Sequence, residues 1–397
     1  MNHRLALFLL FLFAWISAVD AQTSATPRNT VLRGSYGNSQ FVFNTTGKGR
    51  VAFLGGSITE MDGYRPMVCE YLQKKFPKTD FDFVAAGISS TCSDTGAFRL
   101  ESDVLVGGPI DLFFLEFAVN DNQDGFFSVE HALRGFEGIV RHIRTACPNV
   151  DIVVTFFVNE DLMDKYRSGN RADSIKAHWA VCEKYNISTI DLAKEIQERI
   201  DAQTITWQEF GGVHPAPKGN RICADMIASV LNDSWKTPTD KLVAHALPPQ
   251  MDRYSYTNGC FRGFDAIALD GFVLEVPNWK AIPGGFRSRF ADKTLLCANK
   301  PGAACSFEFT GTAVGLYVLA GPDAGDVEYQ IDSGAFQKAR LYHSYSSGLH
   351  YPRSVVLADD LAEGKHKVTL RVSSEKADQS KGTAVRILEI CVQRSND

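Results

Sequence analysis

Hydrophobic positions between residues 51 and 230 alternate between short continuous runs and stretches with a helical period. A continuous run is typical of a strand buried on both faces of a parallel sheet, whereas a period near 3.6 predicts an amphipathic helix. Together they predict an α/β fold, a three-layer doubly wound parallel sheet with helices on both faces. The runs lie at residues 51–54, 81–85, 111–117, 150–158 and 187–190, and the helical patterns at about 66–76, 129–143, 172–185 and 217–230.

The pattern changes after Leu231. Residues 236–253 contain three prolines and no strong period, so we expect a linker there. From residue 254 onward, short segments of alternating hydrophobicity are separated by Gly, Pro and Asp turns, which predicts an antiparallel, jelly-roll-like β-sandwich. We therefore expect an N-terminal extension at 22–48, an α/β domain at 49–235, the linker, and a sandwich at 254–397.

The first residues have the layout of a secretory signal peptide. A weakly basic start precedes the uncharged stretch from Leu5 to Ile16, and small residues stand at Val19 and Ala21. Such a stretch spans only about 18 Å as a helix, too short for a hydrocarbon core of about 30 Å. We expect cleavage near Ala21 and a secreted or periplasmic protein without a membrane span; an uncleaved anchor is the alternative.

Composition adds to this organisation. The chain has 397 residues, 45% of them hydrophobic and 22% charged, which fits a globular protein too long for one core. The net charge is −5 and no Lys/Arg-rich run occurs, which argues against a nucleic-acid partner.

Cys297 and Cys305 flank Pro301-Gly302, so a hairpin would allow them to pair, whereas buried free thiols fit most of the other cysteines. No zinc-binding pattern is present, and we expect neither a metal nor another cofactor.

Candidate chemistry lies at the ends of the predicted strands, where doubly wound sheets bind their ligands. Gly55-Gly56-Ser57-Ile58-Thr59 follows the first strand, Gly87 the second and Asn120 the third, while His214 precedes the last helix. In this order and spacing the motifs resemble those of the SGNH hydrolase superfamily, the GDSL-like esterases. The resemblance covers about residues 49–230.

The resemblance implies a role for each of the four residues. Ser57 would be the nucleophile and His214 its base, while the amides of Ser57 and Gly87 and the side chain of Asn120 would form the oxyanion hole. The residue types suit this chemistry, because a serine hydroxyl needs a neighbouring base and a developing oxyanion needs fixed donors. Taken alone, Asn120 would fit a turn and His214 a surface loop.

One position departs from the family pattern. SGNH enzymes usually carry an Asp three residues before the catalytic His, where this sequence has Gly211. Glu209 is the nearest carboxylate in sequence, and it is either a substitute for that Asp or a solvated loop charge. We predict a Ser57–His214 dyad in which a backbone carbonyl orients the imidazole.

Three carboxylates adjoin the motifs. Glu60 fits a helix N-terminus, where negative charge is favourable, and Asp121 fits the cap of a turn. Glu116 lies inside an apolar strand pattern, so it needs a partner if it is buried, although the sequence does not identify one.

The substrate class also rests on resemblance. The Gly-Gly-Ser-Ile-Thr variant, the export signal and the attached sandwich are similar to those of secreted carbohydrate esterases that remove acetyl groups from plant or algal polysaccharides. This implies a carboxylic ester hydrolase whose partner is an acylated carbohydrate. A lipid or small-ester hydrolase of the same fold and a glycan-binding protein with a decayed catalytic domain are the alternatives. The sequence does not indicate the oligomeric state.

Overall fold

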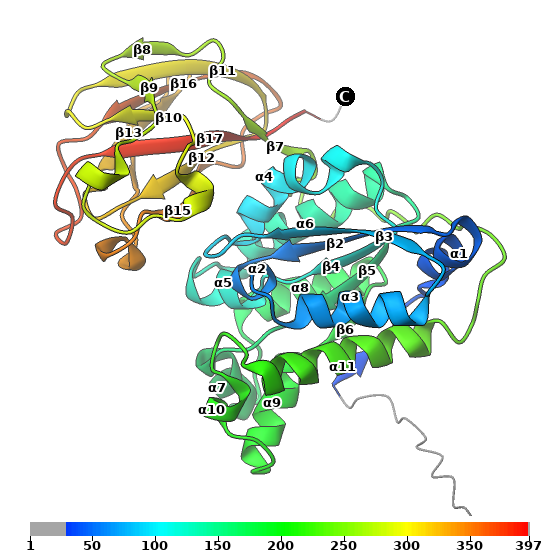
Figure 1. The fold of residues 1–397 in the computed structure, drawn as a ribbon. Coiled ribbons are helices and arrows are strands. Elements are labelled where there is room, and N and C mark those ends of the chain that lie inside the picture. The colour runs from blue at the N-terminus through cyan, green and yellow to red at the C-terminus, as the bar shows by residue number, and fades with distance from the viewer. Residues whose placement is uncertain (1–28, 396–397) are drawn as a thin grey trace, which may run out of the picture.

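The computed structural model describes residues 29–395. The expected signal peptide, residues 1–21, lies outside the described residues. Figure 1 shows two bodies, an α/β domain and a β-rich domain that contains the C-terminal third of the chain. The predicted fold class, a doubly wound sheet followed by a β-sandwich, is confirmed.

The α/β domain is built on a six-stranded sheet with the strand order β1-β6-β5-β4-β2-β3. β1 pairs antiparallel with β6, and the other neighbours are parallel. The chain steps from β2 to β3 in one direction and then returns to β4 on the other side, so the carboxyl ends of β2 and β4 flank the switch point where such sheets bind ligands. The strands are Thr30–Val31 (β1), Lys48–Gly55 (β2), Asp80–Gly87 (β3), Leu112–Leu115 (β4), Asp151–Thr155 (β5) and Ser188–Ile190 (β6).

Helices cover both faces of this sheet, as Figure 1 shows. α3 packs against α11 on one face, and α4, α6 and α8 pack together on the other. The helices are Gly37–Thr46 (α1), Ser57–Glu60 (α2), Tyr64–Lys75 (α3), Ser93–Asp103 (α4), Ala118–Gln123 (α5), Val129–Ala146 (α6), Glu160–Arg167 (α7), Asp173–Lys184 (α8), Leu192–Asp201 (α9), Trp207–Phe210 (α10) and Pro217–Ser234 (α11), with a short 3-10 turn at Leu105–Gly107.

Three segments differ from the sequence-based expectation. Two of the predicted strands are shorter than their hydrophobic runs, because the runs over 111–117 and 150–158 continue past Leu115 and Thr155 as buried loop. Residues expected to be an N-terminal extension form β1 and α1 instead. α1 belongs to the α/β domain because the buried ring of Phe43 packs against Phe76 at 5.2 Å, next to Trp235.

The C-terminal domain consists of two antiparallel sheets that face each other across a second hydrophobic core. One sheet has the order β15-β12-β17-β10-β9 with β7 beside β17, and the other has the order β14-β13-β16-β11-β8. The strands are Gly259–Arg262 (β7), Ala268–Asp270 (β8), Val273–Glu275 (β9), Leu295–Ala298 (β10), Ala304–Gly311 (β11), Ala313–Ala320 (β12), Asp326–Ile331 (β13), Gln337–Arg340 (β14), Tyr351–Ala358 (β15), Gly364–Val372 (β16) and Val385–Gln393 (β17), with 3-10 turns at Trp279–Ala281, Ser288–Phe290 and Ser344–Ser347.

Cys297 and Cys305, for which the sequence left a disulfide open, do not pair. Cys297 lies on β10 in one sheet and pairs with Arg386, whereas Cys305 lies on β11 in the facing sheet and pairs with Leu370. The two residues therefore do not face each other across a hairpin. All nine cysteines lie in the described part of the chain and are free thiols, most of them buried.

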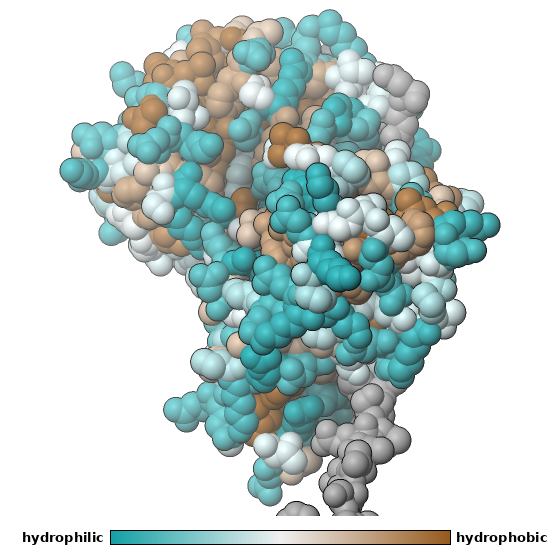
Figure 2. All heavy atoms as spheres, turned by 45° about the vertical axis from the view of Figure 1, so that its right-hand side comes forward, coloured by the Kyte–Doolittle hydropathy of each residue, from teal (hydrophilic) through white to brown (hydrophobic). Residues whose placement is uncertain are grey.

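The two domains differ in the character of their surfaces. In Figure 2 the visible face of the α/β domain is mostly hydrophilic, whereas hydrophobic side chains gather on the upper, sandwich part. Exposed apolar residues of that domain include Leu269, Val273, Leu274 and Val276 along β8 and β9. Among residues 29–395 there is no helix with the length and apolar character that a membrane crossing requires.

Candidate active site

Ser57 and His214 meet at the carboxyl edge of the parallel sheet. Ser57 is the first residue of α2, directly after β2, and His214 lies in the loop between α10 and α11. His214 Nε2 lies 2.8 Å from Ser57 Oγ, which is hydrogen-bond distance for a base and the hydroxyl it deprotonates. Partial burial lowers the pKa of His214, so the ring is neutral, and able to accept a proton, at a lower pH than an ordinary histidine.

Asn120 lies over the turn that precedes Ser57. It belongs to α5, directly after β4, and its side chain is buried. A Cβ atom on Gly56 would lie only 2.1 Å from Asn120 Oδ1, so only glycine fits beneath the amide. Asn120 Nδ2 donates a hydrogen bond to Asp124 Oδ2 at 2.7 Å. Because a carboxamide has two N–H groups, the second is not used by Asp124 and can donate to a ligand.

Gly87 ends β3 opposite Gly55 of β2. A Cβ atom on Gly87 would lie 2.2 Å from the backbone nitrogen of Glu60, so a side chain at this position would displace α2. Glu60 fixes the turn that follows, since its Oε2 accepts a hydrogen bond from the Ser89 amide at 2.8 Å and a second one from the Ser89 hydroxyl. Glu60 thus connects the helix of Ser57 to the turn of Gly87, in addition to its predicted place near the start of a helix.

Glu116 is the buried partner of the Ser57 turn, a partner that the sequence leaves unidentified. Its Oε1 accepts hydrogen bonds from the Gly56 amide at 2.9 Å and from the Thr59 hydroxyl at 2.6 Å. Burial raises the pKa of the Glu116 carboxyl to about 7, even though these hydrogen bonds favour the ionised form. The Glu116 carboxyl therefore fixes the residues on both sides of Ser57, and it is mostly uncharged below about pH 7.

Asp121 and Asp124 fix the segment around Asn120. Asp121 is fully buried and accepts hydrogen bonds from the amide and hydroxyl of Ser93, at 2.8 and 2.6 Å, and lies 2.9 Å from Nε2 of His178. It thus holds α5 to α4 and α8, a wider role than the predicted turn cap. Burial raises the pKa of Asp124, the partner of the Asn120 amide, to about 6.

The loop that carries His214 leaves no room for the usual orienting Asp. Gly211 has φ +108, a left-handed conformation, and a Cβ atom there would lie 2.0 Å from the backbone nitrogen of Ala216. That nitrogen donates to the Phe210 carbonyl at 2.8 Å and closes the loop. The position three residues before His214 is thus occupied by backbone, and an aspartate there would break the loop.

Glu209 does not reach His214. Its carboxylate accepts from the Thr206 amide at 2.8 Å in a capping box and pairs with Lys218 at 2.9 Å. Lys218 and the Thr206 bonds lower the pKa of Glu209 to about 2. Among the described residues, neither a carboxylate nor a backbone carbonyl bonds to the His214 ring, so the carbonyl expected to orient the imidazole is not found. Burial is the cause of its lowered pKa.

The β-sandwich contributes three side chains to this region. Arg289 donates to the Gly87 carbonyl at 3.1 Å and pairs with Glu60 Oε1 at 2.9 Å. Arg287 donates to the Ser89 carbonyl at 2.7 Å and to Ser90 Oγ at 2.8 Å. His343 Nε2 donates to the Asp124 carbonyl at 3.0 Å. The C-terminal domain therefore contacts the segments that carry both Gly87 and Asn120.

The contacts of these three side chains with the α/β domain could not be predicted from the sequence. The two arginines stand in a segment rich in glycine and polar residues, and His343 precedes a short 3-10 turn, so no periodicity identifies them. The pair of arginines flanking Ser288 is the only local sign, and a charge pair in a loop usually indicates a solvated surface. Their roles depend on how the two domains pack.

Comparison with known proteins identifies the class of the α/β domain. Residues 53–222 match the sequence model of the GDSL-like Lipase/Acylhydrolase family, so this domain is a GDSL-like acylhydrolase domain and the chain a carboxylic ester hydrolase. The resemblance to the SGNH and GDSL-like esterases is confirmed. No curated protein sequence matches the chain.

Solved structures extend the likeness to both domains. A two-domain esterase (CEX) active on acetylated mannans, co-crystallised with mannopentaose, is 20% identical, with a TM-score of 0.75 over 93% of this chain and 98% of that chain. An acetylxylan esterase from Geobacillus stearothermophilus, Axe2, is 17% identical over 49% of this chain and 97% of that chain, with a TM-score of 0.39. The first likeness shows that the two-domain fold is shared.

Proposed function

We propose that the protein is an exported serine esterase that removes acetyl groups from carbohydrate. The observation that carries the proposal is the 2.8 Å contact between Ser57 Oγ and His214 Nε2 beside Asn120. A hydroxyl paired with a neutral imidazole, next to fixed hydrogen-bond donors, is the arrangement that acyl transfer requires. Export is inferred from the leader-like sequence that ends near Ala21.

The reaction would proceed through an acyl-enzyme. His214 takes the Ser57 proton as Oγ attacks the acetyl carbonyl, and the oxyanion is stabilised by the Ser57 and Gly87 amides and the free N–H of Asn120. The C–O bond to the sugar then breaks, and the imidazolium gives its proton to the departing sugar oxygen. A water, deprotonated by His214, attacks the acetyl-serine, and acetate leaves as Oγ takes back the proton.

His214 would act without a carboxylate partner. The closed loop at Gly211 restricts the backbone around His214, and the engagement of Glu209 by Thr206 and Lys218 leaves it unable to substitute. An orienting Asp normally fixes the tautomer and stabilises the imidazolium. In a dyad the rigid loop and the hydrogen bond to Ser57 would fix the ring, while the imidazolium is less stabilised, so proton transfer depends more on the position of the ring.

Carbohydrate is favoured as the substrate for two reasons. The two-domain esterase that shares the whole fold is described as active on acetylated mannans. The site also lies at an edge where a second domain contacts the same loops, which suits a long substrate better than a small ester.

The test is a substrate panel. Acetate release from acetylated mannan and acetylated xylan is measured beside hydrolysis of p-nitrophenyl acetate and p-nitrophenyl palmitate. We expect the highest kcat/KM on at least one acetylated polysaccharide and little or no hydrolysis of the palmitate. Faster hydrolysis of the palmitate than of every acetylated glycan would instead establish a lipid esterase.

A further inference from the structure

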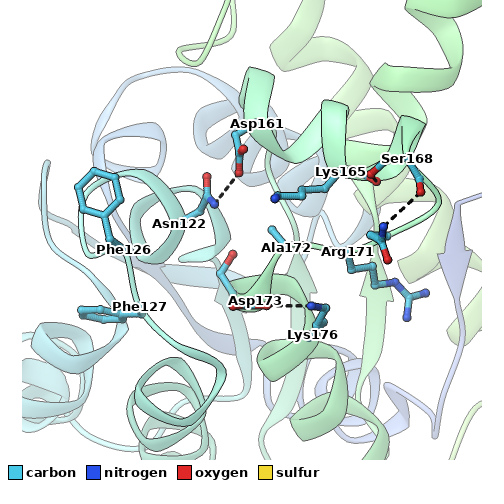
Figure 3. Close-up of a pocket in the computed structure, with 12 residues that line it drawn as sticks. Asn122, Phe126, Phe127, Asp161, Lys165, Ser168, Arg171, Ala172, Asp173 and Lys176 are labelled. Carbon is cyan, nitrogen blue, oxygen red and sulfur yellow. Dashed lines mark hydrogen bonds and ion pairs between the residues drawn. The ribbon is translucent and has the colours of Figure 1, made fainter.

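An open cavity of about 400 Å³ adjoins the segment that carries Asn120. Figure 3 shows side chains from α5, α7 and the start of α8 around one space, with Asn122, Asp161 and Lys165 directed toward it and the ring of Phe126 at its side. Its volume is within the range of about 300–1,000 Å³ that small-ligand sites occupy. Nine of its lining residues are polar or charged, and only Phe126, Phe127 and Ala172 are apolar.

Phe126 has two unusual properties at once. Its side chain is 74% exposed, and its backbone has φ +50, a left-handed conformation that a bulky residue rarely adopts. The neighbouring Phe127 is different, since its ring packs on His131 with 4.0 Å between ring centroids. Strain at an exposed aromatic side chain is not compensated by burial, and residues retained in such conformations cluster at binding and catalytic sites.

The turn that strains Phe126 is attached to Asn120. The Gly125 amide donates to the Asn120 carbonyl at 2.9 Å, and the Phe127 amide donates to the Asp121 carbonyl at 2.9 Å. Two backbone hydrogen bonds therefore fix the position of Phe126 relative to the residue proposed as an oxyanion donor. A ligand group that contacts the ring would be held at a set position relative to the reacting ester.

The polar groups complement the ring. Asn122 Nδ2 donates to Asp161 Oδ2 at 3.0 Å, and both keep further hydrogen-bonding capacity toward the cavity. Lys165 extends into the space and forms no ion pair within residues 29–395. One exposed aromatic face beside amide, carboxylate and ammonium groups suits a pyranose, which has an apolar C–H face and a rim of hydroxyls. A lipid acyl chain would need a mainly apolar lining.

We propose that this cavity is a sugar subsite, in which Phe126 stacks on a pyranose of the polysaccharide backbone while Asn122, Asp161 and Lys165 bind its hydroxyls. The inference rests on the proposed function, since it places a neighbouring sugar of the same chain whose acetyl group reaches Ser57. The subsite determines specificity for polymers. A small ester such as p-nitrophenyl acetate does not extend to it.

Because the backbone of Phe126 is strained, variants at this position can separate a role in ligand binding from a role in stability. Phe126→Gly and Phe126→Asn remove the ring while tolerating a positive φ. We expect both variants to unfold at the same temperature as wild type or a higher one. The loss in kcat/KM on acetylated xylo- or manno-oligosaccharides of five or six units, mainly through KM, should exceed the loss on p-nitrophenyl acetate by about fivefold to tenfold. Phe126→Tyr, which keeps a stacking face, should restore oligosaccharide KM.

The matched control is Phe336→Ala, which removes another exposed phenylalanine, from the turn between β13 and β14, where its ring contacts Arg371, and should leave kcat and KM on both substrates unchanged. Calorimetric titration of the same oligosaccharides into Ser57→Ala, with and without Phe126→Gly, measures binding independently of turnover. Equal affinities in that pair would overturn the subsite, whatever the outcome for the esterase. Equal losses on oligosaccharide and small ester would also overturn it, because Phe126 would then act only by supporting the Asn120 turn.

Discussion

At the scale of single residues, the decisive feature is that His214 contacts Ser57 although no carboxylate of the described residues bonds to its ring. His214 Nε2 lies 2.8 Å from Ser57 Oγ, while the usual position of the orienting acid is occupied by the backbone of the Gly211 loop. Burial lowers the pKa of His214 and no neighbouring charge raises it. The ring is therefore neutral at neutral pH and suited to act as a base, but its imidazolium is less stabilised than in a triad.

This arrangement predicts different consequences for the two candidate partners of Ser57. We expect His214→Ala to lower kcat on p-nitrophenyl acetate by about 10³-fold or more. We expect Glu209→Ala to stay within about threefold of wild type and to reduce mainly stability, since it removes the capping box at the start of α10. Lys218→Ala, which leaves Glu209 free of its ion pair, is the matched control and should also be active. A loss in Glu209→Ala as large as that in His214→Ala would contradict the dyad.

At the scale of elements, the Ser57 turn depends on a buried carboxyl from the neighbouring strand. Glu116 follows β4 and accepts hydrogen bonds from Gly56 and Thr59, on either side of the proposed nucleophile. Burial raises its pKa from 4.5 to about 7. Ionisation is therefore less favourable in the folded protein than in the unfolded chain, so the free energy of unfolding falls as the pH rises from about 5 through 7.

Glu116→Gln should remove this pH dependence. The amide oxygen can accept the same two hydrogen bonds but does not ionise. The free energy of unfolding of the variant minus that of wild type should rise by roughly 3 kcal/mol from pH 4.5 to pH 8, because each pKa unit corresponds to about 1.4 kcal/mol. Urea unfolding of both proteins at the two pH values measures the difference, in which the other titrating groups cancel. A gap between the two proteins that does not change with pH would show that Glu116 has an ordinary pKa.

The sequence predicted those elements whose signals are local. Runs of buried residues located the parallel strands, and the strand ends located Ser57, Gly87 and Asn120, because the carboxyl ends of parallel strands share one edge. His214 followed from its place before the last helix. The partner of Glu116 was not predictable, since Gly56 and Thr59 meet it only once β2 and β4 are paired.

The features that the sequence did not predict depend on contacts between segments that are far apart in the chain. The pairing of Cys297 with Cys305 assumed that nearby cysteines face each other, whereas their strands belong to different sheets. Residues 22–48 have a weak pattern, yet part of this segment forms β1 and α1, because tertiary contacts such as that of Phe43 with Phe76 override local propensity. The contribution of the sandwich to the site required knowledge of the domain packing.

At the scale of the whole molecule, the C-terminal domain supports the loops of the proposed oxyanion hole. Arg289 bonds to the Gly87 carbonyl and to Glu60, and His343 bonds to the Asp124 carbonyl beside Asn120. The sandwich thus fixes the positions of two donors that belong to the other domain. Preorganised donors of this kind account for a large share of the rate enhancement in acyl transfer.

Arg289→Ala should therefore lower kcat about tenfold on p-nitrophenyl acetate, with a smaller change in KM, because one loop bearing a donor loses its fixed position. Arg340→Ala is the control, since Arg340 pairs with Asp326 within the sandwich at 3.2 Å and does not contact the site loops. Steady-state kinetics of both variants, with thermal unfolding measured alongside, separates positioning from stability. Equal kinetic losses in the two variants, or a change in KM alone, would contradict the positioning role.

The measurement that tests the account most directly is the hydrolysis of p-nitrophenyl acetate and the release of acetate from acetylated mannan and xylan by wild type and Ser57→Ala. The account predicts turnover of both kinds of substrate by wild type and a loss of at least about 10³-fold in the variant, with unchanged thermal unfolding. Equal rates in the two proteins, or inactivity of both, would contradict the proposal that Ser57 is the nucleophile of an esterase.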